Sequence, residues 1–171
     1  MHNIVRSSFS SLVTGIIASI FSTFFLYMMK PRVEISPAIA KQTDTKGNYF
    51  YGIKVINKGR CAIKNIDVTW EILIPKRVPC GVRYEFIPIK LRKMVKYIDG
   101  KNRKNRNMYI YNTTKNIEKM WKDTTNWQIS FKMYCEHAIF STGKLFVKTY
   151  YYKPTDIVEG VFKADNSLEI V

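Results

Sequence analysis

The residues of this chain best suited to chemistry are cations concentrated in one short stretch. Between positions 90 and 106 a basic side chain recurs every few residues, and only Asp99 opposes them. The cations are Lys90, Arg92, Lys93, Lys96, Lys101, Arg103, Lys104 and Arg106, with tyrosines at Tyr97, Tyr109 and Tyr111. Cations neutralise phosphates and aromatic rings stack on bases, so the stretch predicts contacts to a nucleotide or a single-stranded oligonucleotide. The predicted contact residues are Lys93, Lys96, Lys101, Arg103, Lys104, Arg106, Tyr109 and Tyr111.

The charge of the whole chain agrees with an anionic partner. Its formal net charge is +15 at pH 7, and almost all of the excess follows residue 30. Two other interpretations of the basic stretch stay open. An anionic inner leaflet attracts basic residues that lie near it. The chain is also rich in Lys, Asn, Ile, Tyr and Phe together, as an AT-rich genome would produce, so the surplus of lysine can also be a solvated surface without a specific role.

Catalytic patterns are weak, and the sequence predicts a protein that is not an enzyme. Ser141-Thr142-Gly143-Lys144 ends like a phosphate loop but lacks the upstream glycine and falls in a predicted hairpin. His137 lies near Glu136 and Ser141, yet no second acid or metal cluster is expected to converge on it. A structural hydrogen-bonding role is the simpler interpretation. We retain His137 and Lys144 as predicted ligand contacts.

The cysteines and histidines predict neither a metal site nor a cofactor. Cys61, Cys80 and Cys135 form an odd, sparse set without metal-ligand spacing, which is typical of a reducing compartment. The two histidines, His2 and His137, are too few to complete a Cys/His zinc site.

The element that precedes the basic stretch is an uncharged segment, residues 7–29, which follows a short flank, residues 1–6. About twenty apolar helical residues cover the roughly 30 Å of a bilayer core, so the segment predicts a transmembrane helix. A cleaved signal peptide is rejected, although a small-x-small site exists at Ala38-Ile39-Ala40. The apolar core is too long, and charged residues intervene before that site.

The charges that flank residues 7–29 predict an orientation. Arg6 precedes the segment, and Lys30, Arg32, Lys41 and Lys46 follow it. The positive-inside rule therefore predicts the orientation of a single-pass membrane protein, with membrane lipid as a partner. The N-terminus is predicted to be periplasmic and the C-terminal domain cytosolic.

The same helix is expected to carry a face of small and hydroxyl side chains. That face comprises Ser7, Ser11, Thr14, Gly15, Ala18, Ser19, Ser22 and Thr23. Small residues let helices approach closely, so the pattern favours a homo-oligomer, and a water-filled pore is a further alternative. Serine and threonine also bond back to their own helix, in which case the pattern has no partner.

Residues 30–171 predict one mainly β domain, an antiparallel β-sandwich with one short helical insertion. Hydrophobic residues alternate with polar ones over 68–74, 127–136 and 145–152, and the last two segments form a predicted hairpin around 141–143. Further strands are expected at 33–41, 50–57, 84–91, 108–112 and 167–171, with turns at 44–48, 58–59, 79–81 and 99–100. The insertion is expected at 114–123, capped by Thr114.

Three segments carry a resemblance to known proteins. They are KPRVEISP (30–37), IKVINK (53–58) and HAIFSTGK (137–144). With the N-terminal segment, they resemble small bacterial proteins that have one helix and a cytosolic β-sandwich. The arrangement also resembles the transmembrane effectors of nucleotidyltransferase-linked antiphage defence.

The resemblance implies functions that the residues themselves do not. It implies a tetrameric effector of the bacterial inner membrane, a channel or membrane-disrupting protein, that senses a nucleotide or oligonucleotide made by a partner nucleotidyltransferase. The alternative is a non-conducting, membrane-anchored scaffold or protein-interaction module.

Overall fold

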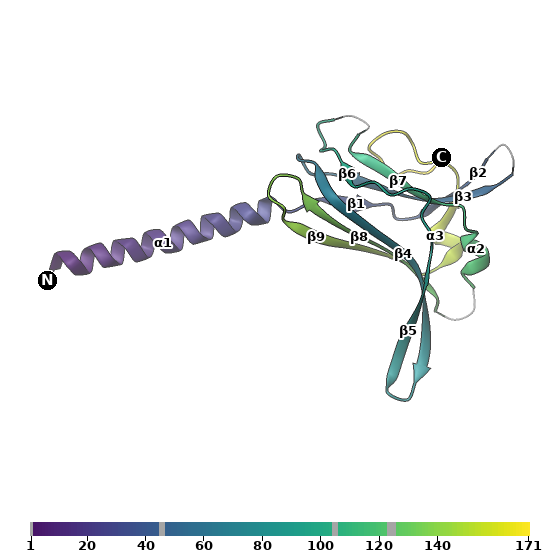
Figure 1. Ribbon diagram of the computed structural model, residues 1–171, viewed down its shortest axis with the longest axis horizontal. Helices are drawn as coiled ribbons and strands as arrows, with labels where there is room; N and C mark the ends of the chain where they lie inside the picture. Colours follow the sequence, from purple (N-terminus) through teal and green to yellow (C-terminus); the bar gives the residue numbers. More distant parts are fainter. Residues whose placement is uncertain (1, 45–46, 104–105, 123–125) are drawn as a thin grey trace. The chain divides into compact units, whose positions relative to one another are not determined.

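The computed structural model describes residues 2–44, 47–103, 106–122 and 126–171, except for the side chains of residues 2–12 and 28. The chain divides into two compact units, Met1–Lys30 and Pro31–Val171. The first unit consists of helix α1 (His2–Met28), and the second contains two β-sheets (Figure 1).

Helix α1 corrects the prediction of a membrane span. Within the described ranges, no helix is both long enough and apolar enough to cross a bilayer. The predicted transmembrane helix over 7–29 and the single-pass inner-membrane location are therefore wrong. The channel and antiphage-defence roles that accompanied them have no support.

The small-residue face of α1 is exposed wherever its side chains are described. The exposed positions are Thr14, Gly15, Ala18, Ser19, Ser22 and Thr23, while the side chains of Ser7 and Ser11 lie outside the described residues. Thr23 Oγ1 donates a hydrogen bond to Ser19 O at 2.9 Å, so this hydroxyl bonds back to its own helix. Self-association of α1 stays a prediction.

The second unit contains two five-stranded sheets. In sheet A, β3 (Tyr49–Asn57) is central, because β1 (Val33–Ile35) and β2 (Ile39–Thr43) pair with successive parts of one edge and β7 (Met108–Thr113) pairs with the other. Strand β10 (Ile157–Glu159) adds to β2 in parallel.

Sheet B is built around the longest strand, β4 (Ile63–Val78). Its order is β5 (Gly81–Pro88), β4, β8 (Gln128–His137) and β9 (Gly143–Tyr150), and β6 (Tyr97–Ile98) pairs with the start of β4. Two single-turn helices, α2 (Ile117–Met120) and α3 (Lys153–Asp156), join strands of the two sheets.

The apolar faces of the two sheets share one core. Alternation along β4 and β8 buries Trp70, Ile72 and Phe131 on one side, and alternation along β3 and β7 buries Ile53 and Tyr111 on the other. The rings of Tyr111 and Phe131 meet across the interface, with centroids 5.6 Å apart. These buried aromatic and β-branched residues are what the period-two pattern predicted, and the mainly β fold is confirmed.

Several predicted elements differ in detail. The hairpin of β8 and β9 is confirmed. The predicted strand 33–41 is two strands, because the chain turns at Ser36-Pro37, where Ser36 Oγ donates to Ala38 O. Helix α2 begins after Asn116, whose side chain accepts from Lys119 N, so the predicted cap at Thr114 is wrong. Asp123, at the end of the predicted helix, lies outside the described residues.

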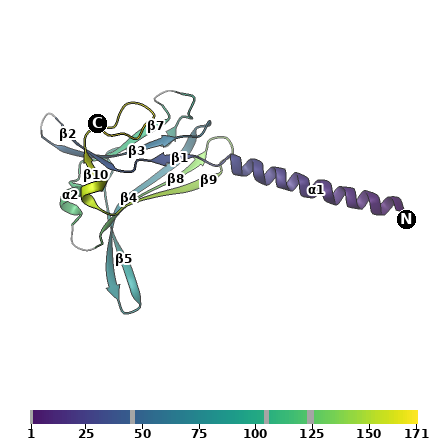
Figure 2. The same ribbon diagram turned by 180° about the vertical axis from the view of Figure 1, so that it is seen from behind.

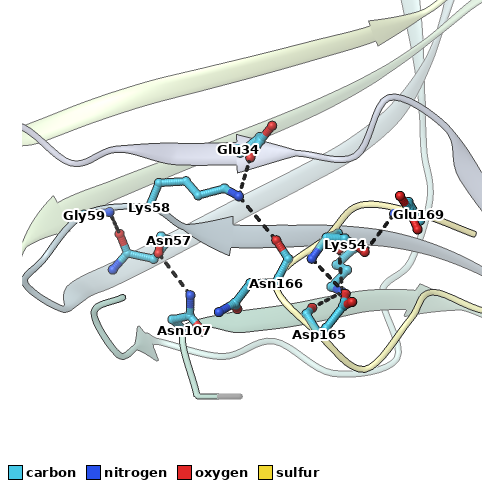
Figure 3. Close-up of polar contacts among 10 residues, drawn as sticks. Glu34, Lys54, Asn57, Lys58, Gly59, Asn107, Asp165, Asn166 and Glu169 are labelled. Atoms are coloured by element: carbon cyan, nitrogen blue, oxygen red, sulfur yellow. Dashed lines mark hydrogen bonds and ion pairs between the residues drawn. The ribbon is translucent and has the colours of Figure 1, made fainter. Parts of the chain in front are cut away.

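The C-terminal prediction is also corrected. Residues 167–171 form no regular strand, only an isolated bridge between Phe162 and Ile170, and the pairing of β10 with β2 is parallel rather than antiparallel. Residues 160–171, here called the strap, lie over the outer face of sheet A (Figure 3). This explains why Lys54 and Ile56 of β3 are fully buried although they point away from the core shared by the sheets.

Candidate anion-binding edge

The predicted basic stretch lies along the free edge of β7. Thr113 Oγ1 donates to Lys90 O at 2.7 Å, Arg92 N donates to Asn112 O at 2.8 Å, and Asp99 N donates to Arg106 O at 3.1 Å. Lys90 and Arg92 thus contact the end of β7, and Asp99 contacts Arg106 just before β7 begins, so the stretch runs antiparallel to this strand. Its cations are thereby distributed along one edge of the two-sheet unit instead of being scattered over its surface.

A buried amide joins a second basic loop to this edge. Asn57 Nδ2 donates to Cys61 O at 2.9 Å and to Asp99 O at 3.0 Å. Its Oδ1 accepts from Gly59 N at 2.9 Å (Figure 3). Lys101 N donates to Gly59 O at 2.8 Å. The connection between β3 and β4 therefore lies against the connection between β6 and β7.

Close backbone contact brings the cations of both loops together. A Cβ at Gly100 would lie 2.0 Å from Arg60 O, so only glycine permits this approach. We define the basic edge as the cations of both loops and of the stretch beside β7. They are Lys58, Arg60, Lys90, Arg92, Lys93, Lys96, Lys101, Arg103 and Arg106, all of them exposed.

Two carboxylates contact the basic edge without neutralising it. Asp99 lies 4.0 Å from Arg106 Nε and accepts from Tyr97 OH at 3.2 Å, and Glu34 pairs with Lys58 at 2.9 Å. Burial and the bond to Asp99 raise the pKa of Tyr97, whose ring is 54% exposed. The edge therefore combines a positive potential with an accessible aromatic ring.

A shallow hollow lies at the Arg92 end of the edge. It encloses about 400 Å³ and is lined by Arg92, Lys93, Tyr109, Ile110 and Asn112. The Arg92 guanidinium lies 5.7 Å from the centre of the Phe50 ring, which holds it against β3. The Asn112 amide lies directly over Gly52, where a Cβ would be 2.6 Å from Asn112 Oδ1. The hollow thus offers cations and an amide within a volume that suits a small ligand.

The structure brings most of the predicted contact residues together. Lys93, Lys96, Lys101, Arg103 and Arg106 all belong to the basic edge, and the half-buried Tyr109 lines the hollow. Lys104 lies outside the described residues.

Tyr111 is placed where it cannot contact a ligand. Its ring is fully buried against Tyr109 and Phe131, and burial raises its pKa far above the usual range. The periodicity of β7 accounts for this, because Tyr111 alternates with the outward-facing Ile110 and Asn112.

His137 and Lys144 belong to the β8–β9 hairpin of sheet B and not to the basic edge. His137 is buried, and its Nδ1 accepts from Ile139 N at 3.3 Å and from Phe140 N at 3.4 Å. Burial lowers the pKa of His137, so the ring stays neutral and stabilises the turn. Lys144 is exposed, and its ammonium lies 4.8 Å from the centre of the Phe146 ring.

Lys58 and Arg60 are members of the edge that sequence reasoning missed. Their only local signal is the Lys58-Gly59 turn, which gives no indication that this loop packs against residues 99–101. The contact depends on Asn57 and Gly100, which lie far apart in the sequence.

The described part of the chain shows no metal centre or activated nucleophile. Within it, no group of three or more His, Cys, Asp or Glu side chains is placed to hold a metal ion. Cys135 is buried in the core, and burial raises the pKa of its thiol to about 12, so it stays protonated at neutral pH.

Comparisons with known proteins add no assignment. No protein-family model matches the chain, and no curated protein is detectably similar to it in sequence.

Proposed function

We propose that the two sheets form a β-sandwich whose basic edge binds a polyanion, either a single-stranded oligonucleotide or a nucleotide. The observation that carries this proposal is the pair of contacts made by Asn57 and Lys101, which hold two basic loops side by side. The cations of residues 90–106 and those of the loop at 58–60 thereby form one continuous cationic surface. Such a surface attracts phosphates and releases their counterions.

The aromatic and amide groups of the edge favour a nucleic-acid ligand over a simple anion. Tyr97 is largely exposed beside Asp99, and Asn112 lines the hollow next to Arg92, whereas the ring of Tyr109 packs against Tyr111 and the core. Rings stack on bases, and an amide pairs with base edges. Phosphate contacts along the edge would position a strand, while the hollow would accept one of its bases.

Fluorescence anisotropy with a labelled single-stranded oligonucleotide tests the proposal on the full chain. Changing Lys101, Arg103 and Arg106 to Gln should lower affinity and make the slope of log affinity against log salt shallower by about 2, from roughly 0.7 per phosphate contact. The matched control changes the exposed Lys115, Lys119 and Lys122 to Gln, which removes the same charge elsewhere.

Two results would contradict the proposal. One is absence of binding at low salt, where attraction is strongest. The other is an equal loss of affinity in both triple variants, which would mean that only the total charge matters.

A protein-interaction role is the second candidate. Exposed apolar side chains on the β4–β5 hairpin favour it, among them Val82, Tyr84 and Phe86. The two functions use different surfaces and are compatible in one protein.

A further inference from the structure

The β4–β5 hairpin projects from the body of the two-sheet unit. Strand β4 pairs with β8 only as far as Leu73, while its pairing with β5 continues to Val78. Residues 74–85, here called the arm, therefore form a two-stranded ribbon, with the pair of Leu73 and Phe86 at its base. The arm extends away from both sheets in each view (Figures 1 and 2). A ribbon of two strands is only marginally stable in water, so a further strand would stabilise it.

The two faces of the arm differ in character. Cross-strand neighbours place Leu73 with Phe86, Pro75 with Tyr84, and Arg77 with Val82 on one face. Val82 is 57%, Tyr84 42% and Phe86 56% exposed, so this apolar face is largely open to solvent. The opposite face carries the charged residues Lys76, Arg83 and Glu85 beside Ile74 and Val78, and there Lys76 pairs with Glu85 at 2.5 Å.

Among the described strands, β5 is paired on one side only, with β4. Val78 and Gly81 flank the two-residue turn, and in a hairpin of this length the flanking pair is of the hydrogen-bonded kind. Directly opposed pairs then alternate between bonded and non-bonded. Pro75 lies opposite Tyr84, in a position of the non-bonded kind, which suits a residue without an N–H. Val82, Tyr84 and Phe86 therefore direct their backbone groups to the open edge. An unprotected edge of this kind is a template for another strand.

The sequence of β5 is self-complementary around Tyr84. If a second copy of β5 pairs antiparallel with Tyr84 opposite Tyr84, Arg83 lies opposite Glu85 of the second copy, and Glu85 opposite its Arg83. On the apolar face, Val82 of one copy lies opposite Phe86 of the other, and Phe86 of the first copy lies opposite Val82 of the second. Each opposed pair is then either oppositely charged or apolar, and both kinds stabilise a sheet.

Other registers fit less well. In a register that pairs odd-numbered with even-numbered residues, backbone N–H and C=O groups that point to the open edge lie opposite groups that point toward β4. Such a register forms no ladder of hydrogen bonds. The two neighbouring registers that keep the backbone match place Arg83 opposite Arg83, or Glu85 opposite Glu85, and like charges directly opposed are destabilising.

We propose that the arm is a homodimer contact in which β5 pairs edge to edge with β5 of a second copy, about a two-fold axis at Tyr84. The contact is isologous, as two-fold dimers are, and joins the two B sheets through their arms. It uses neither the basic edge nor α1, so its outcome is independent of polyanion binding.

Disulfide cross-linking of the full chain tests the register. In a Cys80→Ser background, which removes the exposed cysteine of the arm, Tyr84→Cys brings two Cα atoms to about 5.5 Å, within disulfide reach. Val82→Cys is the matched control, because two such residues lie about 14 Å apart in this register. We expect a disulfide-linked dimer with Tyr84→Cys after mild oxidation. No cross-link with Tyr84→Cys, or equal cross-linking with Val82→Cys, would overturn the proposal.

Charge reversal tests the contact by sedimentation. In a dimer of Arg83→Glu, a carboxylate at position 83 faces the carboxylate of Glu85 in the other copy. In a dimer of Glu85→Arg, two guanidinium groups face each other in the same way. Each variant should therefore dimerise at least about tenfold more weakly than the parent. An equimolar mixture restores both opposite-charge pairs and should form heterodimers with at least the parent affinity. A mixture that stays as weak as its components would sink the proposal, even if each variant by itself were monomeric.

Discussion

Lys54 is a buried cation of β3 that binds the strap. Its ammonium is fully buried and donates to three main-chain carbonyls of the strap, those of Lys163 at 2.6 Å, Asp165 at 2.6 Å and Ser167 at 2.7 Å (Figure 3). A buried charge is tolerated only where hydrogen bonds replace its hydration. The bonds therefore fix the strap to β3, and they give a lysine in the middle of a strand a structural role that alternation alone does not reveal.

Replacing this ammonium should release the strap. Lys54→Met keeps the length of the side chain but leaves three carbonyls without their donor, so the free energy of unfolding should fall by about 3 kcal/mol. Urea denaturation measures this, with Lys119→Met on α2 as an exposed control. Hydrogen exchange at residues 161–171 should rise in Lys54→Met alone. Equal stability in the two variants would show that the strap is held by its other contacts.

His137 should make stability depend on pH in mildly acidic solution. Its folded pKa is lowered by burial, and its Nδ1 accepts two main-chain N–H groups, so only the neutral ring fits. Between the lowered pKa and the unfolded value near 6.5, the unfolded chain binds more protons. The contribution is therefore complete above pH 6.5 and is lost as the pH falls through the folded pKa.

Thermal or urea unfolding between pH 7 and pH 5.5 checks this sign. His137→Asn retains an acceptor that does not titrate, so its stability should change less with pH than that of the parent. His2→Asn removes the other histidine and should leave the parent's pH dependence intact. An unchanged pH dependence in His137→Asn would assign the effect to other groups.

At the scale of elements, prediction succeeded where a pattern is local. The alternation of Ile129, Phe131 and Met133 with polar residues predicts β8, and the short turn at 141–143 predicts its partner β9. The strap and the parallel strand β10 were not predictable in this way, because partners distant in the sequence hold them, above all Lys54 and β2. The candidate site was predicted in part for the same reason. The cations of 90–106 follow one another in the sequence and were recognised, whereas Lys58 and Arg60 join them through long-range contacts of Asn57 and Gly100.

Gly100 links the two basic loops and can be tested as an element contact. Gly100→Ala places a methyl group 2.0 Å from Arg60 O, so the loops must separate. We expect a loss of about 1–3 kcal/mol in the free energy of unfolding, as for other overpacked sites, together with weaker oligonucleotide binding. Gly15→Ala on α1 is the control, since a Cβ there meets nothing within 4 Å. Unchanged affinity in folded Gly100→Ala would show that the contact between the loops does not assemble the site.

At the scale of the whole molecule, the two proposed surfaces have a joint consequence. A dimer joined through the arms carries two basic edges, and a long flexible strand that reaches both binds the second one intramolecularly. A single strand of about 60 nucleotides should therefore bind the parent more than about tenfold tighter than it binds Arg83→Glu, while a short oligonucleotide should bind the two about equally. Mixing Arg83→Glu with Glu85→Arg should restore the difference between long and short strands, because it restores the dimer. Anisotropy titrations of both strands against each protein, at one salt concentration, measure these affinities. If the mixture restores dimers but not tight binding of the long strand, the two edges do not act on one ligand, and the arm serves assembly alone.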